Sequence, residues 1–175
     1  SLAWAVSQPP PEKLDPGACT PFTVTVRTGA YIRQYVIIWD GALVGAHTEV
    51  KGSVLFPNAK APHQNYVGDS LLGRRVTLGA GTQVVRSTIR GPAVVGEGCL
   101  IQDSFIGPFT SIGPNTVLTR SEIENSIVLE NCTIIDIGSR IGGSLIGKNV
   151  KITRSDKPPR NYGFMVGDNS EIIVL

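Results

Sequence analysis

Aliphatic side chains recur every five or six residues along most of this chain, and this period constrains the fold more than any other feature. The pattern begins near Leu14, is interrupted between Leu55 and Val67, and ends near Ile152. A six-residue repeat is the signature of a parallel β-helix, a solenoid of short strands. Each flat side needs one stiff, inward apolar side chain, and each corner favours Gly, Asn, Asp or Pro. A β-sandwich is disfavoured because its strand signals recur at about 8–12 residues.

The repeat divides the 175 residues into three segments. Residues 1–13 carry no repeat and are interpreted as a lead-in segment, and residues 14–152 form the all-β solenoid of about seven or eight coils. Residues 153–175 form an exit segment whose apolar end, Glu171–Leu175, is expected to cap the open edge of the last coil.

Two irregularities interrupt the repeat. The stretch Phe56–Tyr66 contains two prolines and predicts an irregular side or an outward loop. Five-residue steps occur among the six-residue steps from Val84 to Val128, and they predict a boundary between a half that carries the site and a structural half.

The balance of charges excludes several classes of partner. The net charge is +2, from 16 Lys and Arg against 14 Asp and Glu, which argues against nucleic acid and membrane surfaces as partners. No apolar run approaches the roughly 20 residues of a membrane span. Cys19, Cys99 and Cys132 show no pairing motif and fit reduced thiols, so a cytoplasmic protein is expected.

His63 is the strongest candidate for chemistry in the sequence. A neutral imidazole can act as a general base near pH 7, and it suits removal of a proton from an amine or hydroxyl that attacks an acyl thioester. A lone histidine can also be structural, and His47 is interpreted as a corner or substrate-edge residue. A zinc site of three histidines is excluded because the chain has only these two, and no metal is expected.

Three motifs resemble the acetyltransferase domain of the glucosamine-1-phosphate acetyltransferase/uridylyltransferase family. They are Thr48–Lys51, Ala59–Ser70 and Leu78–Thr82, and the resemblance covers roughly residues 26–82. It implies a left-handed, hexapeptide-repeat β-helix and N-acetylation of an amino-sugar 1-phosphate with acetyl-CoA as co-substrate. It also implies a homotrimer with sites between neighbouring prisms, in which apolar residues such as Trp39 and Phe56 would be covered.

The same resemblance implies roles for individual residues. His63 corresponds to the base that deprotonates the sugar amine, and Glu49 to the carboxylate that orients this base. Arg33 and Lys51 correspond to the cations that hold the sugar phosphate, although they also fit solvated surface charges. A phosphate monoester needs two or more fixed cations, and Arg offers a bidentate fork. The positions beside the sugar and the acyl donor are Asn65, Tyr66 and Ala80.

Residues 84–175 resemble a different relative, the C-terminal β-helix of long-form glucose-1-phosphate thymidylyltransferases. The motifs are Ser104–Gly113, Ser126–Asn131, Ser144–Asn149 and Gly167–Ser170. Thr77 replaces an Asn of the acetyltransferase family, and the sequence after Thr82 lacks that family's insertion. No Gly-rich phosphate loop of a nucleotidylyltransferase is present. Two functions therefore stay open: a sugar N-acetyltransferase, or a non-catalytic oligomerising or regulatory module of a sugar-nucleotide enzyme.

Overall fold

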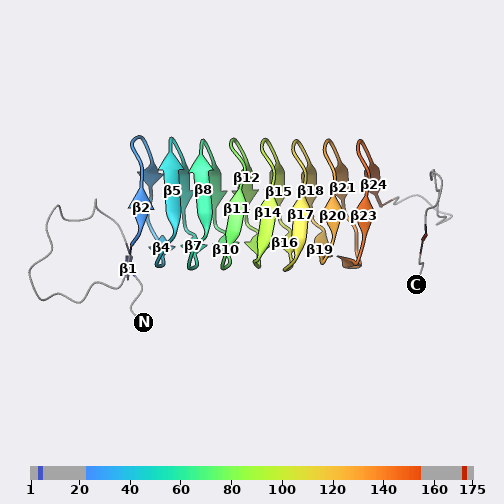
Figure 1. Cartoon of the computed structure of the whole chain (residues 1–175), viewed down its shortest axis with the longest axis horizontal. Helices are drawn as coiled ribbons and strands as arrows, with labels where there is room; N and C mark the ends of the chain where they lie inside the picture. The colour runs from blue at the N-terminus through green and yellow to red at the C-terminus, as the bar shows by residue number, and fades with distance from the viewer. Residues whose placement is uncertain (1–3, 6–22, 155–170, 173–175) are drawn as a thin grey trace, which may run out of the picture.

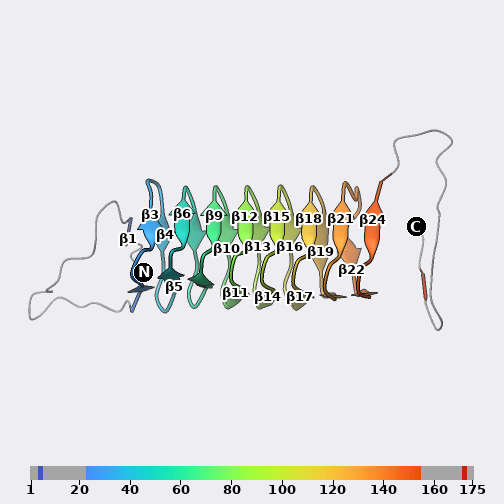
Figure 2. The same cartoon turned by 90° about the horizontal axis from the view of Figure 1, so that it is seen from above.

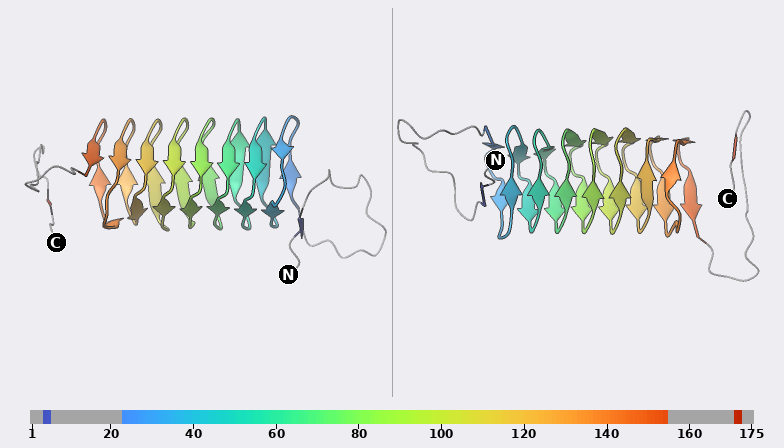
Figure 3. Two further views of the ribbon diagram at one scale, coloured as in Figure 1. Left: turned by 180° about the vertical axis from the view of Figure 1, so that it is seen from behind. Right: turned by 90° about the horizontal axis from the view of Figure 1, so that it is seen from below.

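The computed structural model describes residues 4–5, 23–154 and 171–172, and these residues form a parallel β-helix (Figure 1). Twenty-four short strands make up three sheets of eight, stacked along one axis as a prism of about eight turns (Figures 2 and 3). The described residues include no helix, and hence none that could cross a membrane. The predicted fold class is confirmed. The left hand expected from the resemblance stays a prediction.

The chain visits the three sheets in the repeating order B, C, A. Sheet A contains β1 (Trp4–Ala5), β4 (Ile37–Ile38), β7 (Val54–Leu55), β10 (Leu71–Leu72), β13 (Thr88–Ile89), β16 (Phe105–Ile106), β19 (Glu122–Glu124) and β22 (Ile141–Gly142). Sheet B contains β2 (Thr25–Val26), β5 (Leu43–Ala46), β8 (Lys60–His63), β11 (Val76–Leu78), β14 (Ala93–Val95), β17 (Thr110–Ile112), β20 (Ile127–Val128) and β23 (Leu145–Ile146). Sheet C contains β3 (Tyr31–Ile32), β6 (Glu49–Lys51), β9 (Tyr66–Gly68), β12 (Gln83–Val85), β15 (Leu100–Gln102), β18 (Val117–Thr119), β21 (Thr133–Ile135) and β24 (Lys151–Thr153).

Neighbouring strands of each sheet are parallel, except that β1 runs antiparallel to β4. Trp4, in the segment interpreted as a lead-in, thus pairs with Ile38 at the first edge of sheet A. The proposed cap Glu171–Leu175 lies mostly outside the described residues. Its two described members, Glu171 and Ile172, are exposed and lie outside any strand, so the cap stays a prediction.

The core is a stack of inward aliphatic side chains, one from each flat side of each coil. Its largest fully buried members are Leu55, Leu72, Leu78, Ile89, Ile101, Ile106, Ile112, Leu118, Ile123 and Ile134. The interruption predicted between Leu55 and Val67 is wrong. Ala61 occupies the inward position of β8 there and is fully buried, so the coil is regular but is filled by a small side chain.

The five-residue steps do not mark a boundary near Val84, because such a step is a regular feature of one corner. Val50 to Leu55 and Val67 to Leu72 already show it where the chain passes from sheet C to sheet A. A single left-handed residue, such as Asp69 with φ of 50°, makes this CA corner. Most coils consequently repeat after 17 residues.

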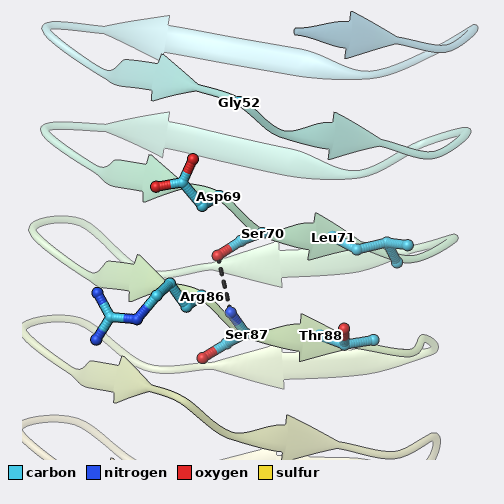
Figure 4. Close-up of a pocket in the computed structure, with 7 residues that line it drawn as sticks. All are labelled: Gly52, Asp69, Ser70, Leu71, Arg86, Ser87 and Thr88. Carbon is cyan, nitrogen blue, oxygen red and sulfur yellow. Dashed lines mark hydrogen bonds between the residues drawn. The ribbon is translucent and has the colours of Figure 1, made fainter. Parts of the chain in front are cut away.

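A ladder of buried serines lines the CA corner on its inner side. Each hydroxyl accepts a hydrogen bond from the backbone N–H one coil further along, as Ser70 does from Ser87 at 3.0 Å (Figure 4). Each also donates to a carbonyl two residues earlier, as Ser87 does to Val85 at 2.8 Å. The further members are Ser53, Ser104 and Ser121. The ladder satisfies backbone groups that the tight corner removes from water.

Cysteines occupy the equivalent inner column at the BC corner, between sheets B and C. Cys99 and Cys132 are free and buried, and their thiols donate to the carbonyls of Gly113 and Gly147. Burial raises the pKa of the Cys99 thiol. Both are therefore small corner residues, as predicted, whereas Cys19 lies outside the described residues.

Acidic and basic side chains alternate on the outer side of the CA corner. The guanidinium of Arg86 donates two hydrogen bonds to Asp103, at 2.6 and 2.8 Å, and Arg120 pairs in the same bidentate way with Asp136. The hydrogen bond from Arg86 lowers the pKa of Asp103 below its ordinary value. Figure 4 shows Asp69 and Arg86 on successive coils of this corner.

We expect Ser87→Ala to lower the free energy of unfolding by about 1–3 kcal/mol, because it leaves the buried N–H of Ser104 without an acceptor. Ser139→Ala is the matched control, since Ser139 is exposed and lies outside the ladder, and its effect should stay within about 0.5 kcal/mol. Urea unfolding monitored by circular dichroism gives both values. Equal effects of the two substitutions would contradict the proposed role of the ladder.

We expect Asp103→Asn to alter how stability depends on pH. The folded-state pKa of Asp103 is depressed, so the pair stabilises the chain above the ordinary value of 3.8 and ceases to do so as the pH falls through the lower folded-state pKa. The stability difference between the wild type and Asp103→Asn should therefore shrink with acidification. The effect is modest because the pair is solvent-exposed, so it is best measured at low salt.

Arg86→Gln provides the test of cause, because removing the guanidinium should remove the same acid dependence. A stability difference between the wild type and Asp103→Asn that is constant over the acid range would refute this assignment.

Candidate functional site

The residues predicted to form a site lie on the first coils, with His63 and Tyr66 on either side of the BC corner, and Arg33 and Lys51 at the other end of sheet C, toward the CA corner. Glu49 and Lys51 belong to β6, Tyr66 begins β9, and His63 ends β8. Glu49 pairs in register with Tyr66, and Lys51 with Gly68. The backbone N–H of Arg33 bonds to the carbonyl of Val50, so Arg33 lies directly after β3 and beside Lys51. The residues of sheet C therefore lie on neighbouring coils, about 4.8 Å apart, whereas His63 lies on sheet B.

Two cations with separate acidic partners lie on this part of sheet C. The Nε of Arg33 is 2.8 Å from Oε1 of Glu49, and the Nζ of Lys51 is 3.9 Å from Oδ2 of Asp69. The side chains of both cations are 48% exposed. Because exposed ion pairs contribute little stability, both cations can exchange their partner for a bound anion at small cost.

Tyr31 was missed by the sequence analysis, although it lies beside these charges. It pairs in register with Glu49, and the guanidinium carbon of Arg33 is 5.1 Å from the centre of its ring. The ring is 59% exposed. An aromatic ring beside a cation offers a surface to the apolar face of a sugar. The signal that could have identified Tyr31 from the sequence is its position one coil before Glu49.

His63 is exposed, and its backbone is fixed on both sides. Its N–H donates to Oδ1 of Asn65 at 3.2 Å, and its carbonyl accepts from the N–H of Gly81 at 3.1 Å. Beside it, β5 approaches β8 so closely that a Cβ on Gly45 would lie 1.5 Å from the carbonyl oxygen of Pro62. Only glycine fits there, and the backbone that carries His63 is consequently rigid.

Asn65 lies inside the corner and not on its surface. Its side chain is 2% exposed, and its amide donates to the carbonyls of Gly79 and Thr82, at 2.7 and 3.3 Å. All the hydrogen bonds of its side chain are made within the chain. Asn65 therefore fixes the backbone of His63 and does not make the direct substrate contact that was expected.

Glu49 is engaged with Arg33 in this structure, and no ion pair joins it to His63 among the described residues. Its expected role of orienting the base thus stays a prediction. Ala80 lies at the BC corner one coil after His63, as the bond between Gly81 and His63 shows. His47 is exposed at this corner with φ of 53°, one position past the register partner of His63.

Two shallow depressions in the surface follow the CA corner. One is bounded by Asp69, Arg86 and Thr88 (Figure 4), and the other by Arg86, Phe105 and Arg120. His63 lines neither of them. Among the described residues the proposed base therefore lies on an open corner that one copy of the chain does not enclose.

Comparison with known proteins finds similarity over part of the chain, and no family model matches it. The bifunctional protein GlmU of Methanocaldococcus jannaschii is 43% identical over 53 residues, which are 30% of this chain and 13% of that protein. A bifunctional sugar-1-phosphate nucleotidylyltransferase/acetyltransferase of Sulfurisphaera tokodaii is 44% identical over 55 residues, 31% of this chain and 14% of that protein. The chain thus spans a small part of the length of these relatives.

Acetyltransferases are among the solved structures that align with this chain. The acetyltransferase domain of PglB from Neisseria gonorrhoeae, in complex with acetyl coenzyme A, covers 65% of this chain and 54% of its own, with 21% identity and a TM-score of 0.33. A hexapeptide transferase family protein from Anaplasma phagocytophilum covers 68% and 75%, with 19% identity and a TM-score of 0.36.

The expected resemblance to sugar-1-phosphate nucleotidylyltransferase/acetyltransferases is confirmed over about 30% of the chain. The resemblance expected for residues 84–175 stays a prediction. What the sequence and the structure establish together is a parallel β-helix, part of which is similar in sequence to those bifunctional proteins.

Proposed function

We propose that this chain carries an acyltransferase site that N-acetylates an amino-sugar 1-phosphate of the glucosamine-1-phosphate type, with acetyl-CoA as donor. The observation that carries the proposal is the pair of cations Arg33 and Lys51 at one end of sheet C, on the two coils before the one whose rigid BC corner presents His63. This combination supplies anion recognition and a base on one fixed frame. The similarity to bifunctional nucleotidylyltransferase/acetyltransferases supports it.

Each group has a defined task in this proposal. Arg33 and Lys51 bind the sugar phosphate, and the exposed ring of Tyr31 packs against the sugar together with Tyr66. His63 accepts a proton from the amine as its nitrogen attacks the thioester carbonyl. The C–N bond forms, the C–S bond breaks, and the departing thiolate of CoA takes up a proton. Asn65 is a positioning residue, since it holds the backbone of His63.

The sugar phosphate and acetyl-CoA both need a site closed off from water, and one copy of the chain leaves the corner of His63 open. This supports self-association, and we propose a trimer. The apolar residues expected to be covered in the trimer, Trp39 and Phe56, are not the exposed ones. Both are half-buried and stack on each other, with ring centres 6.1 Å apart. Exposed apolar residues lie instead in one row of sheet B, Val94, Ile127 and Leu145, with the exposed Ser111 between Val94 and Ile127.

A second function is favoured by this same apolar row. Val94, Ile127 and Leu145 are 53, 50 and 75% exposed, and they lie several coils away from His63. Such a row fits a module whose main task is to join copies of the chain. If His63 carries no activity, a non-catalytic oligomerising module of a sugar-nucleotide enzyme is the better reading.

The catalytic proposal predicts release of free CoA from acetyl-CoA in the presence of glucosamine-1-phosphate, measured with a thiol reagent. His63→Ala should lower kcat by roughly 100- to 10,000-fold, because it removes the general base. Lys151→Gln is the control, since Lys151 is exposed on the last described coil, and its activity should be close to wild type.

Lys51→Ala should act differently from His63→Ala, by raising KM for the sugar phosphate more than it lowers kcat. Undiminished turnover in His63→Ala would remove this residue as base. Absence of CoA release from the wild type with any amino-sugar phosphate would favour the oligomerising module.

The self-association proposal predicts the mass of a trimer in multi-angle light scattering at micromolar concentration. Ile127→Asp should shift the chain toward monomers, because a carboxylate in the apolar row would have to be desolvated in the interface. Gln83→Asp, at an exposed position on sheet C, is the control and should leave the mass unchanged. A monomeric wild type would contradict the proposal.

A further inference from the structure

A cluster of cations without acidic partners lies at the AB corner, where the chain passes from sheet A to sheet B. Its members are Lys60, Arg74 and Arg75, and we name it the AB patch. All three side chains are exposed, and none takes part in an ion pair among the described residues. By contrast, the arginines of the CA corner, Arg86 and Arg120, each bind an aspartate through two hydrogen bonds.

Hydrogen bonds between coils place the three cations on two adjacent turns. Lys60 begins β8 and pairs in register with Thr77, which follows Arg75 by two residues. The N–H of Arg75 donates to the carbonyl of Pro57, at 3.2 Å, on the coil that carries Lys60. The cations are therefore about one coil apart, roughly 4.8 Å along the axis.

The backbone of Arg75 adds an independent observation. Its φ is 58°, a left-handed conformation that Gly, Asn and Asp adopt most readily; Arg86 and Arg120 also adopt it, at the CA corner, but each of them pairs with an aspartate. The corresponding corner positions on other coils are Gly41, Asn58, Asn125 and Gly143, together with Phe109. An arginine held there without an acidic partner is explained neither by backbone preference nor by an internal ion pair.

The nearest carboxylate at this corner, that of Asp40 on the coil before Lys60, forms no ion pair with the patch among the described residues. Asp40 lies at the same corner, but two coils before Arg74, and it accepts a hydrogen bond from the N–H of Thr23 at 2.8 Å. Arg90, on the following coil, adds a further cation at the rim, with its guanidinium 5.8 Å from the ring centre of Phe105.

We propose that the AB patch binds the diphosphate group of a small molecule. Cations on successive coils suit two linked phosphates, and guanidinium groups can donate to them in bidentate fashion. A net charge of only +2 and the small extent of the patch disfavour nucleic acid and anionic membranes.

The site is separate from the cations proposed to bind the sugar phosphate. Arg33 and Lys51 lie at sheet C, whereas the patch lies at the opposite end of β8 from His63. His63 follows Lys60 by three residue steps along the extended strand, about 10 Å. The proposal concerns binding alone, so it stands or falls independently of the acyl transfer.

Titration calorimetry at low salt, with pyrophosphate and with ADP as probes, tests the proposal on the full chain. The double variant Arg74→Gln/Arg75→Asn removes two charges, and Asn suits the left-handed corner, so folding should be preserved and is checked by circular dichroism. The control Lys151→Gln/Arg154→Gln removes two exposed charges from the last described coil.

Wild type and control should bind pyrophosphate equally, and the patch variant at least about tenfold more weakly, with a shallower dependence on salt. Tighter binding of ADP than of pyrophosphate would identify a nucleoside diphosphate as the ligand class, whereas equal binding would identify the diphosphate alone. Equal affinity of the patch variant and the control would overturn the proposal. So would binding of duplex DNA or phosphatidylserine vesicles without binding of pyrophosphate.

Discussion

The backbone hydrogen bonds between neighbouring coils are the constraint on which the rest of this structure depends. The N–H of Tyr66, for example, donates to the carbonyl of Thr82 on the next coil, and the N–H of Asp69 donates to the carbonyl of Lys51 on the coil before. They fix three columns of inward side chains and three corners, so a residue's position in the repeat decides whether it is core, corner or surface. Aliphatic residues fill the flat sides, while Ser, Thr, Asn and Cys line the inner side of the corners and satisfy the backbone there.

The same stacking gives the proposed site its rigidity. Residues far apart in sequence, such as Arg33, Lys51 and His63, come from strands whose separation is set by the sheet and not by flexible loops. Asn65 links the inner column to the functional surface, because its buried amide bonds two carbonyls while its oxygen accepts the N–H of His63. A corner residue of the scaffold thereby sets the backbone from which the proposed base projects.

The fold could be predicted from the sequence because every coil repeats the same inward aliphatic position. The details that escaped prediction depend on small or atypical residues. Ala61 fills an inward position that looked empty, since alanine does not stand out as a core residue. The tight CA corner was taken for a change in the repeat, because its left-handed positions are held by Asp and Arg, and not only by Gly or Asn.

For the site, resemblance supplied positions but not contacts. It could not show that Asn65 is buried, that Glu49 contacts Arg33, or that Tyr31 lies beside them, because these follow from which side chain faces which neighbour across coils. The apolar row on sheet B was also missed, since its members look like any other aliphatic of the repeat and differ only in facing outward.

The central claim is that one rigid frame, sheet C together with the BC corner, combines phosphate recognition with a base. A crystal structure of the chain soaked with glucosamine-1-phosphate tests it most directly. The account predicts the phosphate between Arg33 and Lys51, and the amine within hydrogen-bonding distance of the imidazole of His63. A sugar phosphate bound elsewhere, or one whose amine points away from His63, would contradict it.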